Sequence, residues 1–140
     1  MIQATFLLAA IVMHRNASTL SRSAAHPALV ATAPAIGRGV APLVLMADGD
    51  AVSRDVREAQ LRTAGFRVSV ARTGFEAIVK ASCHVPDVIL MDDSVTGIDA
   101  AETLRMLRTC PVTAHIPVVR LLPGRRLAQR TLSRLRRVAA

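Results

Sequence analysis

Short apolar runs alternate with amphipathic segments between residues 43 and 122. The runs at 43–47, 68–71, 88–91 and 116–122 have the length of β-strands, and those at 43–47 and 88–91 contain no polar residue. A run without alternation is typical of a strand buried on both faces, as in a parallel sheet. Pro117 and Arg120 weaken the assignment of the fourth run. The pattern therefore predicts three well-marked strands and a fourth that is less regular.

The segment after the first strand has apolar residues at roughly helical spacing. These are Val52, Val56, Ala59 and Ala64, and the residues between them include Arg54, Asp55, Arg57 and Glu58. Gly65 follows where the glycine at a helix C-terminus belongs. We therefore predict a helix that ends near Ala64 and buries this apolar stripe.

Two further helices are marked by capping signals. Thr73 and Glu76 fit a capping box that opens a helix to about His84, and Pro86 stops it. Asp99 is a plausible N-cap for a helix with the apolar stripe Ile98, Ala101, Leu104 and Leu107. Strands that alternate with helices in this order predict an α/β fold, a doubly wound parallel sheet with right-handed crossovers and helices on both faces.

The beginning of the chain differs from this pattern. Residues 1–13 are apolar and uncharged, but the run is too short to span a bilayer, and no basic residue precedes it as in a signal peptide. Ser, Ala, Pro and Gly then dominate up to residue 42, which is typical of a flexible segment. We predict a flexible leader at 1–41, with an export signal and an ordered helix as the alternatives, and a folded domain at 42–122.

The end of the chain is strongly basic. The 140 residues carry a net charge of +8, and the stretch from Arg120 to Ala140 contains seven arginines and no acid. We predict a basic amphipathic tail at 123–140, and a helix there would have an apolar face of Leu127, Thr131, Leu135 and Val138. Three interpretations stay open: a helix packed on the sheet, a basic segment that touches nucleic acid, membrane or an acidic partner, and the remnant of a truncated domain. No base-reading motif favours nucleic acid.

The two cysteines do not indicate a metal site. Cys83 and Cys110 lack metal-ligand spacing, and His84 beside Cys83 makes a pair, whereas zinc usually takes four ligands. They are predicted to be reduced structural thiols of a cytoplasmic protein.

Acidic residues follow two of the predicted strands. Asp48 and Asp50 come after the first, and Asp92 and Asp93 after the third. Ligands of open parallel sheets bind at the carboxyl ends of the strands, so adjacent strands would bring these carboxylates together. Such a cluster suits Mg²⁺, and a carboxylate can also act as the nucleophile in phosphoryl transfer. The alternative is that Asp48 and Asp92 only end their strands and cap loops.

Residues 43–122 resemble the receiver domain of two-component response regulators. The resemblance is carried by the runs Pro86-Asp87-Val-Ile-Leu-Met-Asp92, Leu45-Met-Ala-Asp48-Gly-Asp50, Ala64-Gly-Phe66, Gly74-Phe-Glu-Ala77 and Ala114-His-Ile-Pro-Val-Val119, with Arg54, Gly97 and Asp99 at common family positions. It implies a flavodoxin-like, CheY-like three-layer sandwich, incomplete at the C-terminus. It also implies a signalling function rather than an enzyme.

The resemblance further implies a phosphoacceptor, a metal site and partners. Asp92 would accept a phosphoryl group from a histidine kinase or a phosphotransfer protein. The ligands of Mg²⁺ would be Asp48, Asp50, Asp92 and the backbone carbonyl of Ser94. The signal would pass to a downstream protein partner, with no membrane attachment.

Several residues depart from the family pattern. Gly49 stands where a Mg²⁺-binding acid is usual, which weakens the predicted metal site, and Leu122 stands where a Ser or Thr hydroxyl is usual. The fifth strand with its Lys-Pro is not recognisable, and Lys80 lies too early in the chain to replace that lysine. The alternative function is a non-phosphorylated pseudo-receiver that acts as a protein–protein interaction module. A homodimer through an exposed fourth strand is a further open alternative.

Overall fold

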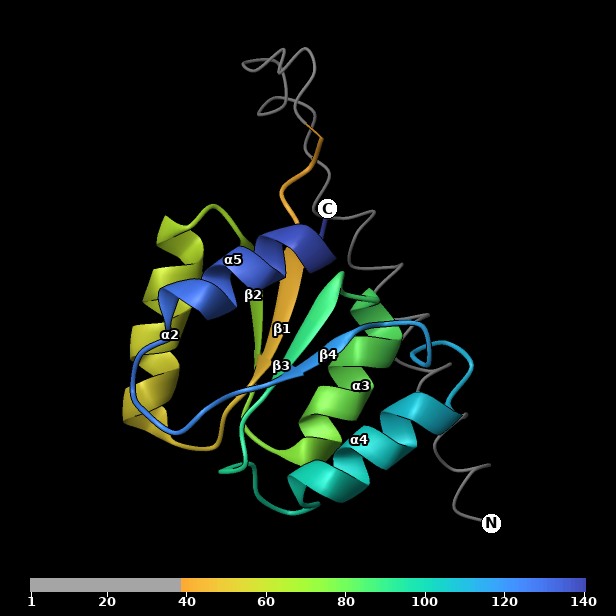
Figure 1. Ribbon diagram of the computed structural model, residues 1–140. Helices are drawn as coiled ribbons and strands as arrows, with labels where there is room; N and C mark the ends of the chain where they lie inside the picture. Colours follow the sequence, from red (N-terminus) through yellow and green to blue (C-terminus); the bar gives the residue numbers. More distant parts are fainter. Residues whose placement is uncertain (1–38) are drawn as a thin grey trace, which may run out of the picture. The chain divides into compact units, whose positions relative to one another are not determined.

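The computed structural model describes residues 39–140, which contain one parallel sheet and four helices (Figure 1). The strands β1 (Leu43–Ala47), β2 (Arg67–Ala71), β3 (Val88–Met91) and β4 (Val118–Arg120) lie in the order β2-β1-β3-β4, and all neighbouring strands are parallel. The predicted doubly wound α/β fold is therefore confirmed. No fifth strand is present in residues 39–140, so β4 is an edge strand.

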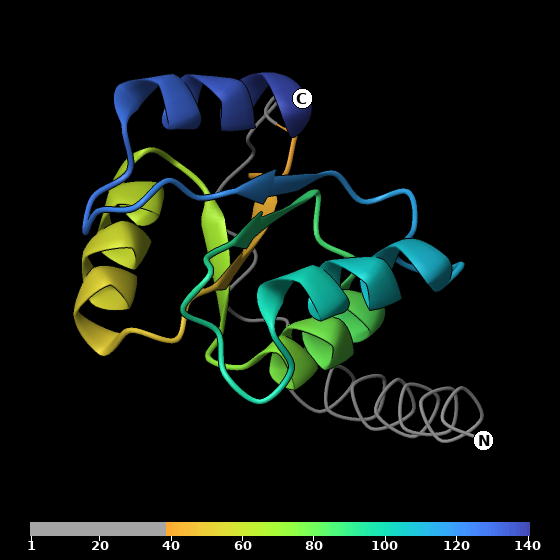
Figure 2. The ribbon, with the colours of Figure 1, turned by 60° about the horizontal axis from the view of Figure 1, so that its bottom comes forward.

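The helices cover both faces of the sheet. They are α2 (Ala51–Thr63), α3 (Gly74–His84), α4 (Ala100–Thr109) and α5 (Gln129–Val138). α2 and α5 lie on one face, and α3 and α4 lie together on the other (Figure 2). Every residue of β3 and the last four residues of β1 are buried, as their continuous apolar runs predicted. Among residues 39–140, no helix is long and apolar enough to cross a membrane.

The capping residues act largely as the sequence predicted. The Thr73 hydroxyl accepts from the amide of Glu76 at 3.1 Å, and Asp99 accepts from the amide of Glu102 at 2.8 Å. The Glu76 carboxylate, however, accepts from the amide of Arg72 rather than from that of Thr73, so only half of the capping box forms. Gly65 has a φ of 94° directly after α2, the left-handed conformation that glycine adopts without strain.

α2 forms where the apolar spacing predicted a helix, but those apolar residues do not make up its buried face. Val52 is 52% exposed, and the buried side chains of the helix are Ser53, Arg57 and Leu61, which follow one another at four-residue intervals. The helix is therefore rotated from the predicted orientation, and it turns a charged side chain toward the carboxyl ends of the strands. This rotation is favourable because the side chains of Ser53 and Arg57 then reach hydrogen-bond partners at the carboxyl ends of the strands.

The basic end of the chain is folded against the sheet. Leu127, Leu132 and Leu135 are buried in one cluster with Val44 and Leu90 of the central strands. This matches the first interpretation of the tail, a helix packed on the sheet. Leu132 is buried although the predicted apolar face did not include it, and Val138, which that face did include, is 38% exposed. The predicted leader lies outside the described residues except for 39–41.

Candidate functional site

The carboxyl ends of β1 and β3 bring two distant acids together. Ala47 lies opposite Met91 in the sheet, so Asp48 and Asp92 leave the two neighbouring strands side by side. Asp48 is fully buried and the Asp92 side chain is 15% exposed. The expectation that the fold would join these two carboxylates is confirmed.

The cation between the two carboxylates is an arginine of α2. Nη1 of Arg57 donates to Asp48 Oδ2 at 2.8 Å and to Asp92 Oδ1 at 2.9 Å. Nη2 donates to the carbonyl of Leu122 at 3.4 Å and to the carbonyl of Gly124. The Arg57 side chain is 2% exposed, and its Nε has no hydrogen-bond partner among the described residues. Buried charges are found paired, and here one guanidinium serves two acids.

Sequence reasoning did not identify Arg57 as part of the site. It counted Arg57 among the charged residues between apolar positions of the helix. The available signal was its spacing from Leu61, four residues later, since residues four apart share one helix face. The carbonyls that Nη2 contacts belong to an irregular loop, and no sequence pattern places such a loop against α2.

Asp48 has its hydrogen-bonding capacity filled by neutral donors as well. The Ser53 hydroxyl lies 3.2 Å from Oδ1 and 3.0 Å from Oδ2, the amide of Asp50 donates to Oδ1 at 2.9 Å, and the Ser94 hydroxyl donates to Oδ1 at 3.1 Å. Together with Arg57 these donors compensate the burial of the carboxylate.

Both carboxylate oxygens of Asp92 are also engaged. Oδ1 accepts from Arg57, and Oδ2 accepts from the amide of Ser94 at 3.0 Å. Burial by itself would raise the pKa of Asp92, but the hydrogen bonds from Ser94 and from Arg57 lower the pKa below its ordinary value of 3.8. Asp92 is therefore an ionised carboxylate whose two oxygens are held in place.

This lowered pKa predicts how stability depends on pH. A carboxyl group whose pKa is lower in the folded state stabilises the fold above its unfolded pKa, and this contribution is lost as the pH falls through the folded value. We expect the wild-type protein to lose stability below about pH 4 more steeply than the Asp92→Asn variant. Denaturation midpoints between pH 7 and pH 2 would check this. Asp93→Asn, which changes an exposed neighbour, should retain the wild-type slope.

The other two predicted metal ligands have different contacts. Asp50 is the N-cap of α2, where its Oδ2 accepts from the amide of Ser53 at 2.8 Å. Ser94 contacts the acids through its hydroxyl and amide, and its hydroxyl also accepts from the amide of Gly49 at 3.0 Å. No group of three or more His, Cys, Asp or Glu residues within 39–140 is placed to hold a metal ion.

The donor set does not fit a magnesium ion. The two converging carboxylates, through which Mg²⁺ would bind, already hold the Arg57 guanidinium between them. The four-ligand magnesium site therefore stays a prediction from the resemblance.

The Gly49 position has no room for a third acidic side chain beside Asp48 and Asp92. A Cβ atom at this position would lie 2.1 Å from the backbone carbonyl oxygen of Ser94, so the loop after β3 closes onto the glycine. Any side chain at residue 49 would push the two loops apart.

We expect Gly49→Ala to destabilise the protein by about 1–3 kcal/mol, the usual cost of overpacking a close contact. Chemical denaturation would measure this, with Gly39→Ala as the control because its Cβ would meet nothing within 4 Å. Equal stability of the two variants would show that the loop after β3 yields freely.

Leu122 and Lys80 both lie away from the Asp92 carboxylate. Leu122 is 56% exposed and contributes only its carbonyl to the site. Lys80 lies on α3, where it pairs with Glu76 at 2.8 Å. Neither residue can donate to Asp92.

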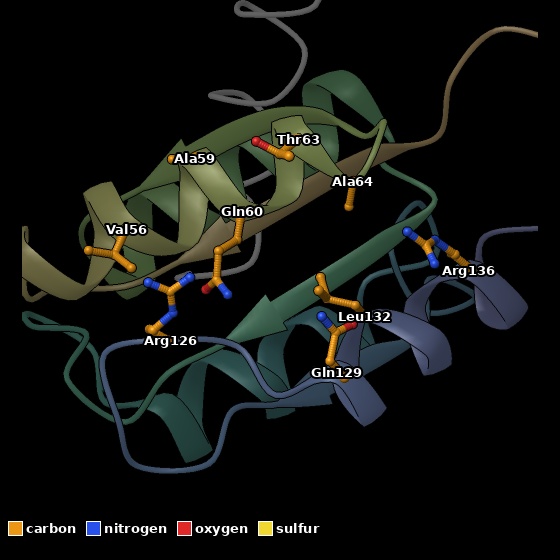
Figure 3. A pocket seen from close by; sticks show the side chains of 9 residues that line it. All are labelled: Val56, Ala59, Gln60, Thr63, Ala64, Arg126, Gln129, Leu132 and Arg136. Carbon is orange, nitrogen blue, oxygen red and sulfur yellow. The ribbon is translucent and has the colours of Figure 1, made fainter.

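A groove of about 590 Å³ lies between α2 and the segment that carries α5 (Figure 3). The α2 side is uncharged, with Gln60 as its one long side chain, and the α5 side carries two arginines. The lining residues are Val56, Ala59, Gln60, Thr63, Ala64, Arg126, Gln129, Leu132 and Arg136. The groove is therefore partly apolar, and its charge is wholly basic.

The chain resembles curated response regulators over about half of its length. It is 39% identical over 72 residues to the response regulator PleD of Caulobacter vibrioides, and 34% identical over 76 residues to a gliding motility regulatory protein of Myxococcus xanthus. These matches cover 50% and 54% of this chain but only 16% and 10% of the relatives. No family model matches the chain.

Solved structures support the same relationship. The N-terminal domain of a response regulator receiver protein from Methanoculleus marisnigri is 27% identical, with a TM-score of 0.56, and the match covers 69% of this chain and 78% of that one. The receiver domain of the sensor histidine kinase PA1611 from Pseudomonas aeruginosa has a TM-score of 0.61 at 23% identity, over 71% of this chain and 94% of that one, which shows a shared fold. That structure has a magnesium ion coordinated in its active-site cleft.

Proposed function

Because residues 39–140 form a CheY-like receiver domain, we propose that this chain acts in two-component signalling as a protein-interaction module that works without phosphoryl transfer. The proposal concerns the receiver domain, since the match to the first two relatives described above spans only 16% and 10% of their length. Receiver domains are signalling modules rather than enzymes, and the proposed activity is binding.

The observation that carries the proposal is the state of Asp92. A carboxylate acts as a nucleophile through an oxygen that can approach phosphorus, and both oxygens of Asp92 are engaged, by Arg57 and by the amide of Ser94. Leu122 stands where the resemblance expects a hydroxyl for the incoming phosphoryl oxygens and is 56% exposed, and Lys80 pairs with Glu76 instead. These features favour an interaction module over a phosphoacceptor.

The second candidate function is the phosphoacceptor implied by the resemblance, in which Asp92 accepts a phosphoryl group from a histidine kinase or a phosphotransfer protein. One observation favours it. The Asp92 carboxylate directly follows β3, its side chain is 15% exposed, and its lowered pKa keeps it ionised. In that case Arg57 would be the cation nearest to the phosphoryl oxygens.

Intact mass after incubation of the full chain with acetyl phosphate and Mg²⁺ separates these two functions. The proposal expects no phosphate-sized gain in mass. A gain that persists in Asp93→Asn and disappears in Asp92→Asn would overturn the proposal and establish the phosphoacceptor.

The surface that we assign to partner binding is the groove between α2 and α5, and the partner that fits it is an acidic amphipathic protein segment. Val56 and Ala59 line the α2 side of the groove and can contact apolar side chains of the partner, while Arg126 and Arg136 on the other side can pair with its carboxylates. None of the arginines beyond Arg120 forms an ion pair with an acid in residues 39–140. A second copy of the chain fits poorly, because it would bring the same positive charges together.

Ala59→Glu should weaken binding of an acidic helical peptide at least about tenfold, since it adds bulk and a repelling charge to the groove floor. The probe is a labelled synthetic helix with leucines on one face and glutamates elsewhere, followed by fluorescence anisotropy. Ala101→Glu, an equally exposed change on α4, is the matched control. Equal binding of a peptide with lysine for glutamate, or binding of duplex DNA that Ala59→Glu leaves unchanged, would contradict this assignment.

A further inference from the structure

The acidic pocket carries its own cation. The three charged side chains of this pocket are largely buried. Asp48 is 0% exposed, Arg57 is 2% exposed and Asp92 is 15% exposed. Two carboxylates that converge in a buried site repel each other unless a positive charge lies between them. Nη1 of Arg57 supplies that charge by contacting one oxygen of each acid.

The guanidinium is enclosed by oxygen atoms on more than one side. Besides the two carboxylates, Nη2 faces the backbone carbonyls of Leu122 and Gly124. Carboxylate and carbonyl oxygens are the donors that hard divalent cations prefer. The surroundings of Arg57 thus consist of ligand types suited to a metal ion, arranged instead around an arginine.

Charge and the hydrogen bonds of Nη1 and Nη2 together hold Arg57 in this position. Its Nε is buried without a hydrogen-bond partner in the described residues, which costs free energy. The closed contact between Gly49 and the Ser94 carbonyl leaves no room for a third acid that would favour a divalent ion over a single positive charge.

We propose that Arg57 is the resident cation of this pocket, which takes the place of a divalent metal ion, and that removal of the guanidinium exposes a latent divalent-cation site. The wild-type pocket is then complete without metal. When the side chain is shortened, the two acids and the loop carbonyls surround a cavity. Binding of Mn²⁺ or Mg²⁺ there compensates the negative charge of the acids. The inference goes beyond the proposed function, because it concerns the pocket before any partner or phosphoryl donor is present.

The test is cation binding by the full chain, with Mn²⁺ followed by electron paramagnetic resonance and Mg²⁺ followed by the melting temperature. We expect the wild type to melt at the same temperature in Mg²⁺ and in chelator. Arg57→Ala should bind Mn²⁺ at least tenfold more tightly than the wild type and should melt higher in Mg²⁺, and Arg57→Ala combined with Asp92→Asn should lose both effects. Arg62→Ala, an exposed arginine of the same helix, is the control.

Saturable stabilisation of the wild type by Mg²⁺ would overturn the inference, as would a folded Arg57→Ala variant that binds no Mn²⁺. If Arg57→Ala is unfolded in chelator, Arg57→Met keeps the apolar stem, and circular dichroism should show either variant refolding on addition of Mn²⁺. Failure of both to refold would also overturn it. The phosphodonor experiment has a separate readout, so a mass gain there would refute the proposed function alone.

Discussion

Replacement of Arg57 by leucine should lower the free energy of unfolding by about 3–5 kcal/mol in metal-free buffer, because removal of one partner leaves the other buried charges uncompensated. Both Asp48 and Asp92 lose the donor at 2.8 and 2.9 Å, and the loop carbonyls of Leu122 and Gly124 lose theirs. This loss is a large part of the 5–15 kcal/mol by which a small domain is typically stable. Urea denaturation, read as a shift in midpoint at constant slope, would measure it.

Two further variants serve as comparisons for the Arg57→Leu result. Arg62→Leu removes an exposed pair with Glu58 on the same helix and should cost less than about 1 kcal/mol. The triple variant Asp48→Asn, Arg57→Met and Asp92→Asn removes every charge of the cluster, and we expect it to be more stable than Arg57→Leu alone. An Arg57→Leu protein as stable as Arg62→Leu would mean that water or a rearranged loop compensates the two acids.

Leu135→Ala should destabilise the protein by about 2–5 kcal/mol, the usual cost of truncating a buried leucine. Leu135 is 0% exposed and packs in the cluster that includes Val44, Val88 and Leu90 of the sheet. The expected loss, measured by chemical or thermal denaturation, would establish α5 as a structural part of the domain rather than an appended basic tail.

The matched control is Leu122→Ala, which truncates the same side chain at a position that is 56% exposed and should change stability by less than about 0.5 kcal/mol. Similar small effects for both variants would mean that α5 is only loosely held on the sheet. A similar large effect would mean that the 122–127 loop has more buried contacts than its exposure indicates.

The docking of α5 depends on polar groups as well as leucines. The Gln60 side chain accepts from the amide of Leu127 at 2.7 Å and donates to its carbonyl at 3.3 Å, and Arg57 contacts the carbonyls of Leu122 and Gly124. Two residues of α2 therefore hold the loop that leads into α5. The acidic pocket and the groove proposed for partner binding are therefore connected through the contacts that Arg57 and Gln60 make with this loop.

The fold could be predicted from local sequence because its signals are local. Continuous apolar runs of strand length are typical of strands buried on both faces of a parallel sheet, and the caps at Thr73 and Asp99 act through bonds within four residues of the chain. The order of strands and helices then determined the topology, which in turn brought Asp48 beside Asp92.

Tertiary structure alone decided what lies between those acids. The rotation of α2 depends on which of its faces finds partners, and the partners of Arg57 are up to 67 residues away in sequence. Apolar spacing favoured the face with Val52, but burial of Leu61 together with two polar residues, compensated by the carboxylates, gave the opposite result. Periodicity measures only where apolar side chains recur, so it cannot detect a buried charge whose compensation comes from distant strands and loops.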